Sequence, residues 1–125
     1  REYRRVWRLT GGSPGQSARI LTEPAVAKRW EKAQEAVAAL AAGNTYGAIA
    51  AITPFEKNRQ EYAAFLETTA SIAANRELWQ ELGLTPATAA ALGLHLQDIL
   101  RRSGENAYLP LTSALFGGWH RLRRE

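Results

Sequence analysis

Residues 24–42 read PAVAKRWEKAQEAVAALAA, and this stretch decides the fold class. Its apolar residues recur at alternating steps of four and three positions: Val26, Trp30, Ala33, Val37 and Leu40. An α-helix turns once every 3.6 residues, so this spacing places all five residues on one face. The stretch therefore predicts an amphipathic helix with one apolar stripe.

The same helical spacing recurs in three later segments of the chain. Their apolar stripes are Tyr62, Phe65, Thr69 and Ile72; Ala89, Leu92, Leu96 and Ile99; and Tyr108, Leu111, Leu115, Trp119 and Leu122. Valine is rare, runs of alternating apolar and polar residues are absent, and the 23 alanines favour helix. We expect eight large side chains to be mostly buried: Trp30, Val37, Leu40, Tyr62, Phe65, Leu92, Leu96 and Ile99.

Capping signals divide the chain into short helical segments. Three helix starts combine a hydroxyl residue with proline: Ser13-Pro14, Thr53-Pro54 and Thr85-Pro86. Four helix stops contain glycine: Gly11-Gly12, Gly43-Asn44, Gly83 and Ser103-Gly104. These signals predict helices near residues 1–9, 14–21, 24–42, 45–52, 55–80, 86–102 and 107–123. The connections are short, so the prediction is an all-α antiparallel bundle of about six to seven helices.

Length and composition exclude several classes of protein. The 125 residues provide one domain-sized core, and 46% of them are hydrophobic. There is no cysteine, which excludes disulfides and thiolate metal sites and is typical of a cytoplasmic protein. No apolar run reaches the length of a membrane span, so we expect no membrane association. The chain begins at Arg1 and contains no methionine, as expected for a piece of a longer protein.

No residues form a recognisable catalytic site. The chain has no phosphate-binding loop with lysine, no dinucleotide-binding glycine motif and no nucleophile elbow. The carboxylate pairs Glu31/Glu35 and Glu77/Glu81 have basic neighbours and are typical of solvated helix faces. His95 lies within an apolar segment and has no obvious acid or nucleophile as a partner. We therefore predict no enzymatic activity, cofactor, metal or small-molecule substrate for this chain.

Positive charge is concentrated at the two ends. The net charge is +4 over residues 1–19, −3 over residues 20–100 and +3 over residues 101–125. Basic ends of this kind are found in nucleic-acid-binding proteins, and they also occur as solvated helix faces. Two alternatives therefore stay open: a stand-alone helical nucleic-acid-binding domain, and a peptide adaptor with an apolar groove.

One stretch resembles a known family. The run from Leu9 to Ala18, LTGGSPGQSA, is similar to the phrase that closes the lid domain of bacterial DNA polymerase III clamp-loader subunits. The order of Trp30, Gly43-Asn44 and the short segment 46–52 is similar to the start of that family's collar domain. The run from Gly104 to Leu109 resembles the opening of its last helix. Within the family, the chain is most similar to the delta prime type of subunit.

The resemblance implies a role in assembly. Residues 1–23 would be the end of the lid domain and a hinge, and residues 24–125 would be the collar domain. Clamp-loader subunits form a five-membered ring through their collars and place the sliding clamp on primed DNA. The implied partners are gamma/tau-type and delta-type subunits, and DNA is contacted only through the complex. We expect the interface to include Trp79, Asn106, Tyr108, Leu109, Phe116 and Trp119, although the aromatic residues among them would equally complete the chain's own core.

Overall fold

The described part of the chain is entirely helical. The computed structural model describes residues 2–55 and 59–106. Its elements are α1 (Glu2–Leu9), α2 (Pro14–Thr22), α3 (Pro24–Ala41), α4 (Thr45–Ile52), the 3₁₀ helix η1 (Thr53–Phe55), α5 (Arg59–Ala74), the 3₁₀ helix η2 (Arg76–Leu78), α6 (Trp79–Leu82) and α7 (Pro86–Asn106). No strand occurs within these ranges, which confirms the predicted all-α bundle. The helix predicted for residues 107–123 lies outside the described residues.

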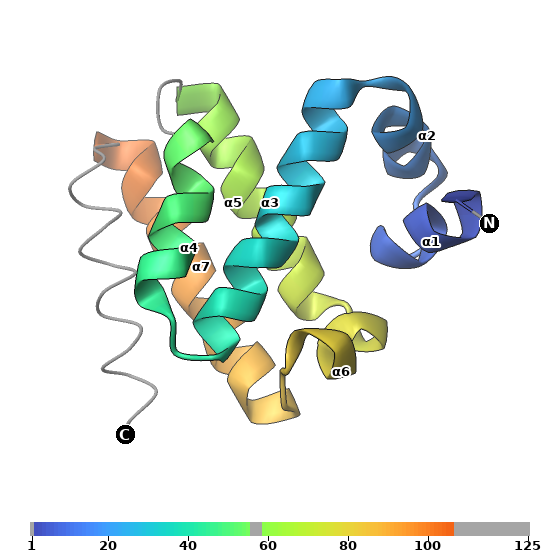
Figure 1. Cartoon of the computed structure of the whole chain (residues 1–125). Helices are drawn as coiled ribbons and strands as arrows, with labels where there is room; N and C mark the ends of the chain where they lie inside the picture. The colour runs from blue at the N-terminus through green and yellow to red at the C-terminus, as the bar shows by residue number, and fades with distance from the viewer. Residues whose placement is uncertain (1, 56–58, 107–125) are drawn as a thin grey trace.

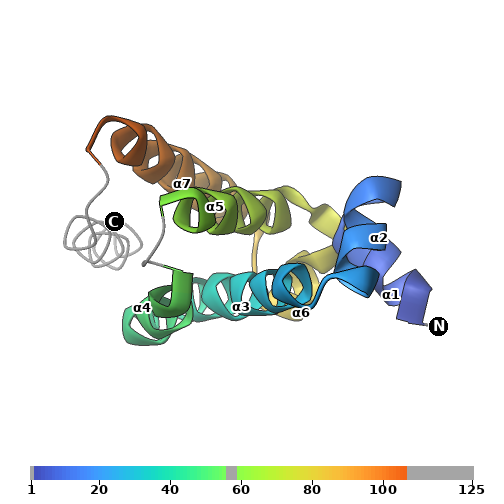
Figure 2. The same ribbon diagram turned by 90° about the horizontal axis from the view of Figure 1, so that it is seen from above.

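Four helices of the bundle form two layers. Helices α5 and α7 form one layer, while α3 and α4 form the other, with α6 beside α3 (Figure 2). The chain runs antiparallel from α3 to α4 and again from α5 to α7, whereas α3 and α5 run in the same direction (Figure 1). Helices α1 and α2 pack at the end where α3 begins. Helix α3 is the central element, because it contacts α2, α4, α5 and α6.

The apolar stripes predicted from the sequence face the core. All eight residues expected to be buried are at most 4% exposed: Trp30, Val37, Leu40, Tyr62, Phe65, Leu92, Leu96 and Ile99. Phe65 stacks on Phe55 at a ring-centroid distance of 4.6 Å, which links α5 to η1. Burial of these side chains supplies the main favourable term in folding.

Two of the three predicted helix starts have the expected caps. The Ser13 hydroxyl accepts a hydrogen bond from the Gln16 amide at 3.3 Å, and the Thr85 hydroxyl accepts one from the Thr88 amide at 3.1 Å. Thr53 begins the short 3₁₀ helix η1 but no α-helix. It lies at the end of α4, where its hydroxyl donates to the Ile49 carbonyl at 2.8 Å, so the predicted start at Thr53-Pro54 is wrong.

The single helix predicted for residues 55–80 is also wrong, because the chain turns at Asn75. The backbone of Asn75 is extended, and its Oδ1 accepts a hydrogen bond from the Glu77 amide. Its Nδ2 donates to the carbonyls of Arg8 and Leu9 at 2.9 and 3.2 Å. These bonds tie the break between α5 and η2 to the end of α1.

The helix stop predicted at Ser103-Gly104 is wrong as well. Helix α7 continues through both residues to Asn106. A glycine raises the free energy of a helix by only about 1 kcal/mol relative to alanine, so it does not by itself end one. Gly83 does end α6 as predicted, and it does so with a left-handed φ of 78°.

Gly47 and Asn44 provide a test of the capping geometry of α4. Asn44 Oδ1 accepts a hydrogen bond from the Gly47 amide at 2.9 Å, and a Cβ on Gly47 would lie 2.6 Å from Asn44 Nδ2. We expect Gly47→Ala to add almost no stability in the native chain, because the new methyl group displaces the cap. In an Asn44→Ala background, the same change should add about 0.5–1 kcal/mol, the usual gain from replacing a helical glycine. Urea unfolding of the four chains measures this difference, and equal effects in both backgrounds would contradict the prediction.

Candidate functional site

The predicted interface residues fall into two groups. Tyr108, Leu109, Phe116 and Trp119 lie outside the described residues, and Asn106 is the last residue of α7. Trp79 is partly buried against the core, and its indole nitrogen donates to the Ala73 carbonyl at 2.8 Å. The Arg76 guanidinium lies 5.7 Å from the centroid of the Trp79 ring. Trp79 therefore has a packing role within this fold, and its role in an interface stays a prediction.

The outward face of α7 is apolar and uncharged over about two turns. Four residues at helical spacing are exposed on this face: Ala87, Ala90, Ala91 and Leu94. Leu94 is 72% exposed, whereas Leu92 and Leu96 on the opposite side are fully buried. No charged residue occurs between Pro86 and Gln97. Helix α7 lies at the edge of the bundle with α5 as its main neighbour, so this face points away from the described bundle (Figure 2).

Small side chains on this face permit a close approach by another helix. A Cβ added at Gly93 would meet no atom within 4 Å, so the space beside it is open. Alanine and glycine on a helix surface let a second backbone pack near it, and an exposed leucine supplies an anchor. The face has the chemistry of a helix-docking surface. The charge-free run from Leu82 to Gln97 is the sequence signal for this face, which the apolar stripe of Ala89, Leu92 and Leu96 does not include.

A second feature is an aromatic and basic surface on α1. Tyr3 and Trp7 are 52% and 40% exposed, and their ring centroids are 6.0 Å apart. Trp7 lines a shallow pocket of about 510 Å³ between the end of α1 and the start of η2. Three arginines also line this pocket: Arg4, Arg8 and Arg76. Arg8 is already engaged, because it forms an ion pair with Glu81 and donates to the Glu77 carbonyl at 3.0 Å.

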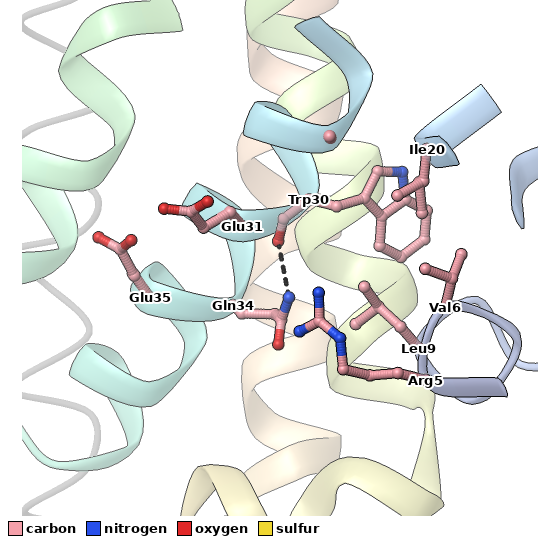
Figure 3. Close-up of a pocket in the computed structure, with 9 residues that line it drawn as sticks. Arg5, Val6, Leu9, Ile20, Trp30, Glu31, Gln34 and Glu35 are labelled. Carbon is pink, nitrogen blue, oxygen red and sulfur yellow. Dashed lines mark hydrogen bonds between the residues drawn. The ribbon is translucent and has the colours of Figure 1, made fainter. Parts of the chain in front are cut away.

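A third feature is a pocket of about 370 Å³ between α1, α2 and α3 (Figure 3). Its apolar lining consists of Val6, Leu9, Ile20, Ala27 and Trp30. The Arg5 side chain extends from α1 toward Gln34, whose amide donates to the Trp30 carbonyl at 3.4 Å (Figure 3). The carboxylates of Glu31 and Glu35 point away from Arg5 in this view. The pocket has room for one apolar side chain beside a cation, but it is not the long groove that binds a peptide helix.

The described residues were searched for a metal-binding group and for a membrane-spanning helix. Residues 2–55 and 59–106 contain no group of three or more His, Asp or Glu side chains that could hold a metal ion. Within the same ranges, no helix has both the length and the apolar character needed to span a bilayer.

The chain was compared with protein-family models, curated proteins and solved structures. No family model matches the chain, and no curated protein or solved structure is significantly similar to it.

Proposed function

We propose that this chain is the collar-type assembly module of a bacterial DNA polymerase III clamp-loader subunit, of the delta prime type. Residues 24–125 would hold the subunit in a heteropentameric ring, and residues 1–23 would be the end of the lid domain and a hinge. The module would have no catalytic activity of its own and would act in the cytoplasm. Its partners would be gamma/tau-type and delta-type subunits, and DNA would be contacted through the complex.

The outward face of α7 is the observation that carries this proposal. Leu94 is 72% exposed on a charge-free helix face, so water contacts this apolar surface in the free chain. Burying the face against a helix of another chain removes the apolar area from water. A stable interface takes roughly 800 Å² from each partner, so the α7 face would form part of a larger contact.

The turn between α1 and α2 supports the proposed hinge. Gly11 and Gly12 both have left-handed backbones, with φ of 70° and 89°. The Thr10 hydroxyl accepts a hydrogen bond from the Ser13 amide at 3.2 Å and lies 2.9 Å from the hydroxyl of buried Ser17. This run is the part of the chain that resembles the end of the clamp-loader lid domain, and it forms a compact turn that directly precedes the capped helix α2.

Light scattering on mixtures tests the proposal. The full chain is mixed with purified collar domains of gamma/tau-type and delta-type subunits, and the mass of the product is measured. We expect a hetero-oligomer of defined mass, and a chain that is monomeric or weakly self-associating when alone. If no complex forms at about micromolar concentrations, where specific interfaces of this size are occupied, the proposal fails.

Nucleic-acid binding is a second candidate function, favoured by the surface of α1. Exposed aromatic rings beside arginines are the combination by which proteins bind single strands, since bases stack on the rings and phosphates pair with the cations. Tyr3 and Trp7 provide the rings, and Arg4 and Arg76 provide cations at the same pocket.

Fluorescence anisotropy with a labelled single-stranded oligonucleotide tests this candidate. We expect affinity to fall linearly with salt concentration on logarithmic axes. Trp7→Ala should weaken binding by about tenfold, the effect of losing one stacked base. Leu21→Ala, which removes an exposed apolar side chain from α2, is the matched control and should change nothing. Failure to bind at physiological salt excludes this function.

A further inference from the structure

A second pocket beside Trp30 has polar walls from three helices. Its volume is about 380 Å³, and it lies between α2, α3 and α5. The lining residues are Gln16 and Arg19 from α2, Arg29 and Trp30 from α3, and Ala64, Glu67, Thr68 and Ser71 from α5. Trp30 is shared with the pocket of Figure 3, where the indole nitrogen is on the side of the ring farther from Arg5 and Gln34.

Two buried polar atoms in the lining residues have no hydrogen-bond partner among the described residues. Trp30 is only 3% exposed, and its Nε1 is a buried donor without an acceptor. Gln16 Oε1 is a buried acceptor without a donor. A buried polar group that lacks a partner is unfavourable, and nearly all such groups in native proteins are satisfied. Both atoms belong to residues that line the same pocket, so one group with an acceptor and a donor can satisfy both.

The hydrogen-bond donors around the pocket suit an anion. The Arg29 side chain is held in place, because its Nε donates to the Thr68 hydroxyl at 3.1 Å and that hydroxyl donates to the Ala64 carbonyl at 2.9 Å. Burial lowers the pKa of Arg29, and the nearby positive charge of Arg19 lowers it further. The negative charges of Glu23 and Glu67 act in the opposite direction and raise it. The two arginines are therefore close enough to repel each other. Arg19 forms an ion pair with Glu23 at 3.2 Å, so the free guanidinium nitrogens of Arg29 are the cationic donors that remain at the pocket.

We propose that this pocket binds a small oxyanion that carries a hydroxyl group, such as hydrogen phosphate or a 2-hydroxycarboxylate. The anionic oxygens would accept from the Trp30 indole and the free guanidinium nitrogens of Arg29, and the ligand hydroxyl would donate to Gln16 Oε1. Guanidinium groups bind carboxylate and phosphate with two parallel hydrogen bonds, which suits either anion. The bound anion would tie α2 to α3 and α5.

The indole proton of Trp30 provides a direct readout. In ¹⁵N–¹H spectra of the full chain, the Trp30 signal is assigned by its loss in Trp30→Phe, which keeps an aromatic ring and removes the N–H. Inorganic phosphate and lactate are titrated at constant ionic strength, with acetate and chloride as controls. We expect a saturable downfield shift of this signal with phosphate or lactate, a weaker response to acetate, which has no hydroxyl, and none to chloride. The stronger of the two responses identifies the phosphate or the hydroxycarboxylate as the preferred ligand.

Variants separate binding at this pocket from a general effect of charge. Arg29→Gln should weaken binding by about tenfold, the effect of losing a charge-assisted pair. If Arg29→Gln does not fold, Arg19→Gln, which changes an exposed side chain, takes its place with a smaller expected loss. Arg101→Gln removes an exposed arginine from α7, which does not line this pocket, and is the matched control, with no expected change. No saturable shift with phosphate or lactate, or the same affinity in the pocket variant and the control, would overturn the proposal. The measurement uses the chain alone, so it is independent of the assembly proposed above.

Discussion

Replacing Phe65 with alanine should lower the free energy of unfolding by about 3–5 kcal/mol, the range found when buried phenylalanines are truncated. Phe65 is fully buried at the middle of α5 and stacks on Phe55 at 4.6 Å. Its removal leaves a cavity that the rigid helices around it cannot fill completely. Urea unfolding followed by circular dichroism measures the loss.

Tyr46→Ala is the matched control for Phe65→Ala. Tyr46 is also aromatic and lies on a helix, but it is 84% exposed. Exposed side chains of this kind change stability by less than about 0.5 kcal/mol. A loss under about 1 kcal/mol at Phe65, or equal losses at both positions, would show that the core has been assigned to the wrong helix faces.

Leu94→Arg should weaken the proposed hetero-oligomer by about tenfold or more, while the stability of the chain stays unchanged. Leu94 is the largest side chain on the outward face of α7 and makes little contact with its own fold. In a docked helix pair, the arginine would put an unpaired charge into an apolar contact, which is strongly unfavourable. Sedimentation of the mixture at several concentrations gives the dissociation constant.

Leu21→Arg makes the same chemical change elsewhere on the surface. Leu21 lies near the end of α2 and is 44% exposed. We expect this variant to assemble with the affinity of the native chain. Equal weakening by both variants would mean that added positive charge, and not the α7 face, is responsible.

The predictable parts of the fold depend on nearby residues. The stripe on α3 is read directly from the spacing of Trp30, Val37 and Leu40, and the caps at Ser13 and Thr85 form within a single turn. Local hydrogen bonds and helical periodicity decide these features, and a single sequence contains both.

One incorrect prediction concerns a feature that depends on distant parts of the chain. Asn75 ends α5 through bonds to Arg8 and Leu9, which are more than 60 residues away in the sequence. Local capping patterns do not contain these contacts.

The candidate surfaces were less predictable than the fold. The spacing of Leu92, Leu94 and Leu96 shows that Leu94 lies on a different face from the other two, but not whether a second helix covers it. Only the arrangement of α5 and α7 exposes Leu94. The pocket beside Trp30 joins residues from three helices, and its two unpartnered polar atoms come from helices whose packing is not encoded in any local motif.

An environment-sensitive fluorophore on Leu94→Cys tests most directly the proposal that α7 docks on clamp-loader collar domains. The native chain has no cysteine, so the label is attached at one position only. Lys28→Cys, at an exposed position on α3, carries the label in the control. On mixing with the gamma/tau-type and delta-type collar domains, we predict a blue shift and stronger emission at position 94, as water leaves the contact, and no change at position 28. An unchanged spectrum at position 94 would contradict the proposed role of this face. This holds whether or not light scattering detects a complex in the same mixture.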